Sequence, residues 1–195
     1  MKQALLVFLS LFFMALICPA AEPVIARTVL NIPEVGKMPN SIAVSLPGGH
    51  NFSFDAKKCI MTAAWKGDFL DRSEDLYNGG EGAKIAGELT YYNRDHFPII
   101  EPAKGQPMFQ GYRIFNGFPT FIYSTGLTKV KVRYAVKDGK LIQSFLIVNT
   151  NYVKYKKASG QKLSSLDGTD FKEDIAEKTQ QPGKLMLVFD FVVGE

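Results

Sequence analysis

The stretch KVKVRYAVKDGKLIQSFLIV, residues 129–148, decides the fold class. In its first half every second residue is apolar, and the residues between them include Lys129, Lys131 and Arg133. A period of two places alternate side chains on opposite faces of a β-strand, so the apolar set faces a core and the cations face away from it. Asp138-Gly139 supplies a tight primed turn. The stretch therefore predicts a hairpin of two antiparallel strands, 129–136 and 141–148.

The same texture continues on both sides of this hairpin. Pro47-Gly48-Gly49-His50 and Asn116-Gly117 predict two further hairpin turns, because these residues tolerate the backbone of tight turns. Other expected strand segments are 41–46, 51–54, 59–65, 87–92, 110–115, 120–124, 152–157 and 184–193. One short helical turn is expected over 171–178, beginning near Thr169 or Asp170. The sequence thus predicts an all-β protein, an antiparallel β-sandwich or supersandwich with at most one or two short helices.

The first twenty-one residues predict export. Met1 and Lys2 give a positive start, residues 4–17 form an apolar run, and Ala20 and Ala21 provide a small-residue cleavage site. The run is short for a membrane helix of about twenty residues, and its order is that of a secretory signal peptide. We therefore expect a signal peptide over 1–21, a single β-sandwich domain over 22–195, no membrane span after cleavage, and a periplasmic or secreted protein.

Charge and cysteine content exclude several classes of function. Removing residues 1–21 leaves 22 basic and 19 acidic residues, too mild an excess to predict nucleic-acid binding. Cys18 lies in the signal peptide, so only Cys59 remains after export. A lone cysteine excludes an intramolecular disulfide, a multi-cysteine zinc site and a Cys-x-x-Cys-His haem attachment. Cys59 is expected to be a small buried residue, and no cofactor is expected.

The polar segment 66–86 is the best candidate for a functional loop. It is rich in Gly, Asp, Glu, Asn and Tyr, and long ordered loops often carry function. Aromatic faces stack on sugar rings, and carboxylate or guanidinium groups hydrogen-bond to hydroxyls. In the alternative interpretation the tryptophan is a core anchor and the acids cap backbone amides. The ligand-binding candidates are Trp65, Asp68, Phe69, Asp71, Tyr77 and Arg94.

Catalytic and metal sites are also conceivable from the residue types, but the catalytic residues stay unknown and no metal site is expected. Paired carboxylates perform glycoside chemistry when they converge in one cleft. Histidines with acids form acid/base pairs or bind metals. The ordinary alternative for each is a solvated loop residue. The candidates are Asp68 with Asp71, Glu81 with Glu88, and His50 and His96 with Asp55, Asp71 or Asp95.

A cationic stripe marks the outward face of the central hairpin. It comprises Lys129, Lys131 and Arg133, with Lys154, Lys156 and Lys157 farther along the chain. Such a stripe suits an acidic polysaccharide, a membrane surface or an acidic partner. Its alternative interpretation is a solvated strand face that discourages edge-to-edge aggregation.

One block of motifs resembles a known family. It consists of Ile42-Ala43-Val44-Ser45-Leu46-Pro47-Gly48-Gly49, Phe54-Asp55, Cys59, Ala64-Trp65 and Gly67-Asp68-Phe69-Leu70-Asp71. The block resembles a secreted bacterial domain found within or beside multidomain c-type cytochrome proteins linked to sugar oxidation, over about residues 38–125. Asp68 departs from the family's glycine, and the chain has no haem-attachment motif. The resemblance implies a β-sandwich that works near oxidoreductases or polysaccharides, and it supplies no catalytic residue.

These observations lead to three hypotheses of function. The first is an exported, non-catalytic binding or accessory module, carbohydrate-related, that serves a periplasmic sugar-oxidation or electron-transfer system. Its partners would be a carbohydrate and a c-type cytochrome or other oxidoreductase. The second is a carbohydrate-active enzyme of epimerase, lyase or hydrolase type that uses loop carboxylates. The third is a structural envelope protein.

Overall fold

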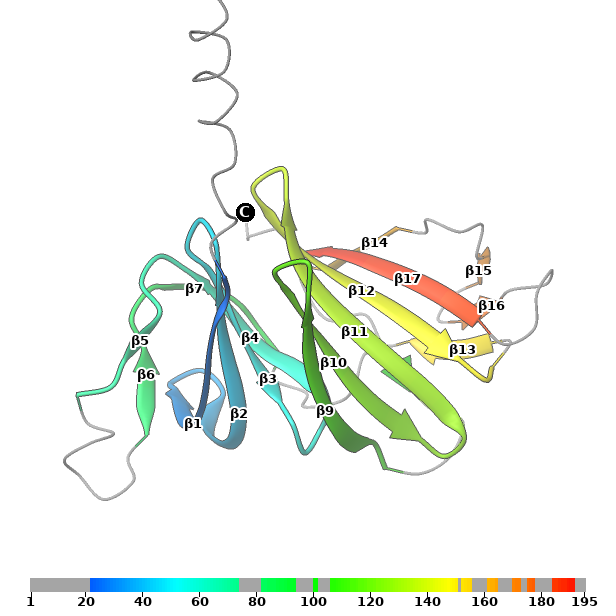
Figure 1. The fold of residues 1–195 in the computed structure, drawn as a ribbon, viewed down its shortest axis with the longest axis horizontal. Helices are drawn as coiled ribbons and strands as arrows, with labels where there is room; N and C mark the ends of the chain where they lie inside the picture. Colours follow the sequence, from blue (N-terminus) through cyan, green and yellow to red (C-terminus); the bar gives the residue numbers. More distant parts are fainter. Residues whose placement is uncertain are drawn as a thin grey trace, which may run out of the picture.

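The computed structural model shows an all-β chain (Figure 1), which confirms the predicted fold class. Within the described residues there is no helix. The backbone is described for residues 22–73, 82–93, 100–101, 106–150, 152–155, 161–164, 170–172, 175–177 and 184–191. Side chains are described for residues 22–73, 82–93, 106–150 and 153–155. The expected signal peptide lies outside the described residues.

The first sheet contains seven strands in the order β5-β6-β1-β2-β3-β4-β7. Its pairs are antiparallel except for β1 and β6, which run parallel, so the predicted antiparallel pattern has one exception. Strand β1 and the first half of β2 lie before residue 41, where local patterns predict no strand. The strands are β1 (Val24–Ile32), β2 (Gly36–Leu46), β3 (His50–Asp55), β4 (Ile60–Lys66), β5 (Leu70–Asp71), β6 (Ala83–Ile85) and β7 (Glu88–Tyr92).

The second sheet is an antiparallel meander extended at one edge, in the order β14-β17-β12-β11-β10-β9. Its central hairpin has the predicted register, with Val136 opposite Leu141. Asp138 and Asn116 have positive φ angles of 51° and 50°, and each is followed by a glycine with positive φ, as primed hairpin turns require. The strands are β9 (Met108–Phe115), β10 (Phe118–Thr125), β11 (Thr128–Lys137), β12 (Lys140–Val148), β14 (Gln161–Ser164) and β17 (Lys184–Phe191).

The helical turn predicted over 171–178 is wrong, because β15 and β16 of a third, smaller sheet lie there. Its order is β15-β16-β13-β8, and Lys172 pairs with Ile175 so that the chain turns back on itself there. Pairing of β16 with β13 satisfies backbone groups that a short isolated helix would leave largely unpaired, so sheet formation overrides the local helix signal. The strands are β8 (Ile100–Glu101), β13 (Tyr152–Tyr155), β15 (Asp170–Lys172) and β16 (Ile175–Glu177).

Aromatic side chains join the first two sheets in the main core. Phe52 of β3 stacks on Tyr134 of β11, with ring centroids 4.1 Å apart. Phe54 of β3 stacks on Phe121 of β10 at 4.2 Å. All four rings are buried, and such pairs add to the stability gained from burial of their area. The two sheets therefore pack face to face through alternate residues of β3.

The opposite face of the first sheet is also covered. Leu30 and Ile32 of β1 form a second apolar cluster with Trp65 of β4 and Ala83 of β6, and Phe69 and Ile85 pack against it. Every residue of β3 is buried, as are all residues of β4 except its last. Buried polar side chains on this face bond to one another, with Ser53 Oγ and Ser41 Oγ 3.1 Å apart. The central strands are thus buried on both faces.

A glycine permits the close approach of β7 to the end of β4. A Cβ on Gly87 would overlap the Lys66 carbonyl oxygen and lie 3.0 Å from the Asp68 carbonyl oxygen. Both neighbours are backbone atoms, which cannot rotate away. The position therefore has no room for a side chain.

Gly87→Ala is expected to lower the free energy of unfolding by about 3 kcal/mol, because a rigid backbone overlap must be relieved by moving a strand. Gly117→Ala is the control: its Cβ would meet nothing within 4 Å, so only its positive φ of 73° opposes substitution, at a cost of about 1 kcal/mol. Urea denaturation of both variants measures the difference. Equal losses would contradict the close contact at Gly87.

Candidate functional site

Trp65 lies in the interior. Its side chain is 1% exposed, and its indole ring is parallel to Phe69 with centroids 6.2 Å apart. The indole Nε1 donates hydrogen bonds to the carbonyl oxygens of Phe69, at 2.8 Å, and Asp68, at 3.1 Å. No face of the ring is open to a sugar in this arrangement. Trp65 is therefore a core anchor that holds the following loop, and we correct its assignment as a stacking platform.

The loop after Trp65 is fixed by backbone contacts. Asn51 of β3 donates its side-chain amide to the Gly67 carbonyl oxygen at 2.9 Å, and the Gly67 amide donates to the Gly49 carbonyl oxygen at 2.9 Å. These bonds join the β2–β3 turn to the start of the loop. The first residues of the candidate loop thus belong to a rigid frame.

The described candidates for sugar binding do not form an open site around Trp65. Asp68 and Asp71 are exposed, and Phe69 is half-buried against the second cluster. The Asp71 carboxylate accepts a hydrogen bond from the Ser73 amide at 2.9 Å, and this bond is the main cause that lowers the pKa of Asp71. Asp71 thus caps a loop amide, as the alternative interpretation held. Tyr77 and Arg94 lie outside the described residues.

His50 and Lys66 form a polar pair at the β2–β3 turn. Lys66 Nζ lies 2.8 Å from His50 Nε2 and donates to the Gly48 carbonyl oxygen at 2.7 Å. An ammonium can only donate, so His50 Nε2 accepts and the ring is neutral with its proton on Nδ1. Partial burial, and then the Lys66 charge, lower the pKa of His50. The pair stabilises the turn. His96, the proposed second histidine, lies outside the described residues.

Cys59 is a buried thiol at a turn. It precedes β4 rather than opening it, with a positive φ of 56°, and its Sγ lies 3.6 Å from the Ala56 carbonyl oxygen. Asp55 Oδ1 accepts hydrogen bonds from the amides of Lys57 and Lys58 in the same turn. Burial, with the Asp55 charge as a second cause, raises the pKa of Cys59 to about 12. At neutral pH the thiol is protonated and therefore a poor nucleophile.

The remaining acidic candidates lie on the surface or outside the described residues. Glu88 is exposed at the start of β7, and Glu81 and Asp95 lie outside the described residues. Within the described part of the chain no three His, Cys, Asp or Glu side chains group closely enough to hold a metal ion.

A cleft opens between the first two sheets, where the β1–β2 ladder is interrupted. The register shifts between Thr28 and Leu30, opposite Pro39, which has no amide hydrogen to donate. Bulges of this kind are frequent beside binding sites. The cleft has a volume of about 410 Å³ and is lined by Arg27, Thr28, Val29, Pro39, Asn40, Ser41, Ile42, Ala56 and Phe109.

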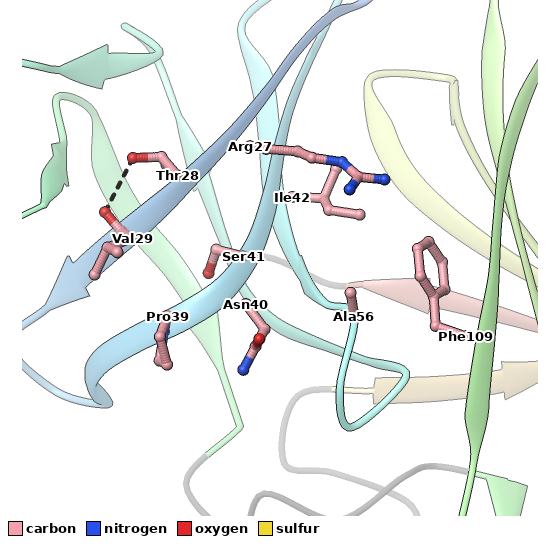
Figure 2. Close-up of a pocket in the computed structure, with 9 residues that line it drawn as sticks. All are labelled: Arg27, Thr28, Val29, Pro39, Asn40, Ser41, Ile42, Ala56 and Phe109. Carbon is pink, nitrogen blue, oxygen red and sulfur yellow. Dashed lines mark hydrogen bonds between the residues drawn. The ribbon is translucent and has the colours of Figure 1, made fainter.

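Figure 2 shows how three side chains of the cleft lie: Arg27 of β1 and Ile42 of β2 point toward the space in front of Phe109 of β9. Arg27 and Ile42 are direct cross-strand neighbours. Arg27 is exposed, and among the described residues its guanidinium has no hydrogen-bond or ion-pair partner. Within the described part of the chain, the cleft therefore combines an unpaired cation with one aromatic ring and a lining of both polar and apolar side chains.

Sequence reasoning missed this cleft. It requires the pairing of β1 with β2 and the approach of β9 from another sheet, neither of which local patterns predict. One signal was present: by alternation, Arg27 falls on the same strand face as Ile25, which packs against the main core. A cation at a core-facing position of a strand is unusual enough to indicate a cleft or a partner.

The described chain is thus an all-β protein with an arginine-lined cleft between two packed sheets. The sequence matches no protein-family model and no curated protein. Among solved structures it is similar to the crystal structure of YidC from Thermotoga maritima, at a TM-score of 0.45 and 12% identity, over 90% of this chain and 52% of that chain. This chain therefore spans about half the length of that protein, and similarity at this level defines neither a shared fold nor a family.

No helix in the described ranges has the length and apolar character needed to cross a bilayer.

Trp65→Ala is expected to lower the free energy of unfolding by about 3–5 kcal/mol, because it removes a large buried ring. Trp65→Phe should lose less, since it keeps a ring beside Phe69 and removes only part of the indole volume together with the two hydrogen bonds of Nε1. Leu127→Ala, at a side chain that is 91% exposed, is the control and should change stability little. Urea denaturation measures all three. A Trp65→Ala variant as stable as Leu127→Ala would contradict the anchoring role.

Stability is expected to fall as pH drops from about 7 to 5 through His50. Its pKa is lowered in the folded state, so below the unfolded value of about 6.5 the unfolded chain binds more protons and unfolding is favoured. Above pH about 6.5 His50 is neutral in both states, and this loss of stability is absent. His50→Gln should make the melting temperature depend less on pH across this range, whereas His96→Gln should leave the pH dependence unchanged. The reverse pattern would refute the assignment to His50.

Proposed function

We propose that the protein is an exported, non-catalytic binding module that takes a carboxylated sugar in the cleft between its two main sheets. The proposal keeps the carbohydrate-related hypothesis, specifies the class of sugar, and assigns the site to the cleft instead of to Trp65. The single observation that carries it is the exposed Arg27 guanidinium, which has no hydrogen-bond or ion-pair partner among the described residues and lies in one cleft with Ile42 and the ring of Phe109.

The chemistry of the cleft matches a sugar acid. A guanidinium binds a carboxylate through two parallel hydrogen bonds, which a lysine or a neutral side chain does not reproduce. The face of Phe109 offers an apolar platform for the C–H groups of a sugar ring. Asn40 lies at the rim and supplies both a donor and an acceptor for hydroxyl groups. The cleft has the size of known small-ligand sites, which begin at about 300 Å³.

The proposed setting follows from the resemblance and the predicted export. Oxidation of a sugar at its terminal carbon yields a carboxylate, so a module beside sugar-oxidising proteins would meet such acids. In this account the partner is a c-type cytochrome or another oxidoreductase of the same compartment, and the module holds the acid rather than transforming it.

Arg27→Gln is expected to weaken binding of sugar acids at least about tenfold, because a hydrogen bond to a charged group is worth about 1.5–3 kcal/mol. Isothermal titration with glucuronate, galacturonate and gluconate, beside glucose and galactose, measures this. Arg113→Gln removes an exposed arginine from the other sheet and should change nothing. Phe109→Leu keeps an apolar side chain, removes the ring face and should weaken every sugar acid.

Two results would contradict the proposal. One is binding of sugar acids that Arg27→Gln leaves intact, which would place the ligand elsewhere. The other is the absence of any binding by the correctly folded protein across the whole panel.

A further inference from the structure

The outer face of the second sheet carries an asymmetric charge. Residues 106–150 contain six cations and a single acid, Asp138, which lies in a turn. Cross-strand pairing aligns Arg113 with Thr120, Thr120 with Arg133, and Lys137 with Lys140. Directly opposed residues share a face of the sheet. The cationic face is defined by Arg113, Lys129, Lys131, Arg133, Lys137 and Lys140.

These cations are not neutralised by the rest of the described chain. Five of the six side chains are exposed, and Arg133 is half-buried. Within the described residues none of them has a salt bridge or a charged hydrogen-bond partner. Arg133 instead lies over two aromatic rings, 5.7 Å from the centroid of Phe115 and 5.2 Å from that of Phe118. Among the side chains that the structure describes, the face is thus a region of uncompensated positive charge.

Apolar side chains fill the spaces between the cations. Lys131 is flanked on its two neighbouring strands by Ile122 and Leu146, and Lys129 has Val148 beside it. These aliphatic residues are only half-buried, whereas the residues between them on the same strands face the core. Phe115 at the end of β9 is 60% exposed, and Leu127 in the turn between β10 and β11 is 91% exposed. The face is therefore cationic and apolar at once.

We propose that the cationic face docks on the surface of an anionic lipid bilayer. Lipid headgroups attract the lysines and arginines, and the interface beneath them removes Phe115, Leu127 and the half-exposed aliphatic residues from water. A soluble acidic polysaccharide would bind only the cations, because it offers no apolar phase to the aliphatic side chains between them. The mixed character of the face favours the bilayer. This inference does not depend on the ligand proposed for the cleft.

The test is sedimentation of the purified exported protein with vesicles of phosphatidylcholine alone and of phosphatidylcholine mixed with phosphatidylglycerol. We expect binding to the mixed vesicles that weakens with added salt, and little binding to the neutral ones. Lys129→Glu/Lys131→Glu should lower the partition coefficient at least about tenfold. Lys57→Glu/Lys58→Glu makes the same change of net charge at the β3–β4 turn and should have little effect.

A second pair of variants tests the apolar contribution. Leu127→Ser should weaken binding to the mixed vesicles, whereas Val24→Ser, at an exposed residue of the first sheet, should not. Circular dichroism confirms that each variant is folded. Equal loss in the two glutamate variants would overturn the proposal. Tighter binding to soluble alginate than to mixed vesicles, lost in Lys129→Glu/Lys131→Glu, would also overturn it and assign the face to an acidic polysaccharide.

Discussion

The rest of the structure depends on the burial of β3 on both faces. On one face Phe52 and Phe54 stack on aromatic rings of the second sheet and hold the two sheets together. On the other, Ser53 is fully buried and Asn51 bonds across to the loop after Trp65. A strand in this position must satisfy its backbone through both neighbours, because water reaches neither face. Its polar side chains bond inward through Asn51 Nδ2 and Ser53 Oγ, whereas Asn51 Oδ1 has no hydrogen-bond partner among the described residues.

The two proposed sites lie where this burial ends. The β3–β4 turn brings Ala56 to the cleft, and the interrupted β1–β2 ladder leaves Arg27 facing the gap beside β9. The outer face of the second sheet is one layer farther out, so its cations remain in solvent while its inner residues supply the core. The buried centre thus presents two surfaces of different chemistry, the cleft that we propose for a small acid and the cationic face that we propose for a bilayer.

Local patterns predicted the hairpins well, because alternation and primed turns depend only on residues that are neighbours in the sequence. The alternation of Val130 and Val132 with Lys131 fixed which face was buried. The same reasoning offered Trp65 both as a sugar platform and as a core anchor, and it could not choose between them, since the choice depends on whether β6 and Phe69 cover the ring. The helix prediction for residues 171–178 was wrong because the pairing of β16 with β13 is a long-range contact that local patterns do not contain. Arg27 was missed because its cleft requires strands from two sheets.

The most direct test of the central claim is native-state hydrogen exchange, which measures the protection of each backbone amide. We expect the amides of Phe52, Phe54 and Thr62 to be among the slowest in the protein, exchanging only on global unfolding. Amides of the edge strand β9 should exchange much faster. Exchange from β3 and β4 as rapid as that from β9 would contradict the account, because it would show that strands buried on both faces do not form the stable centre of the fold.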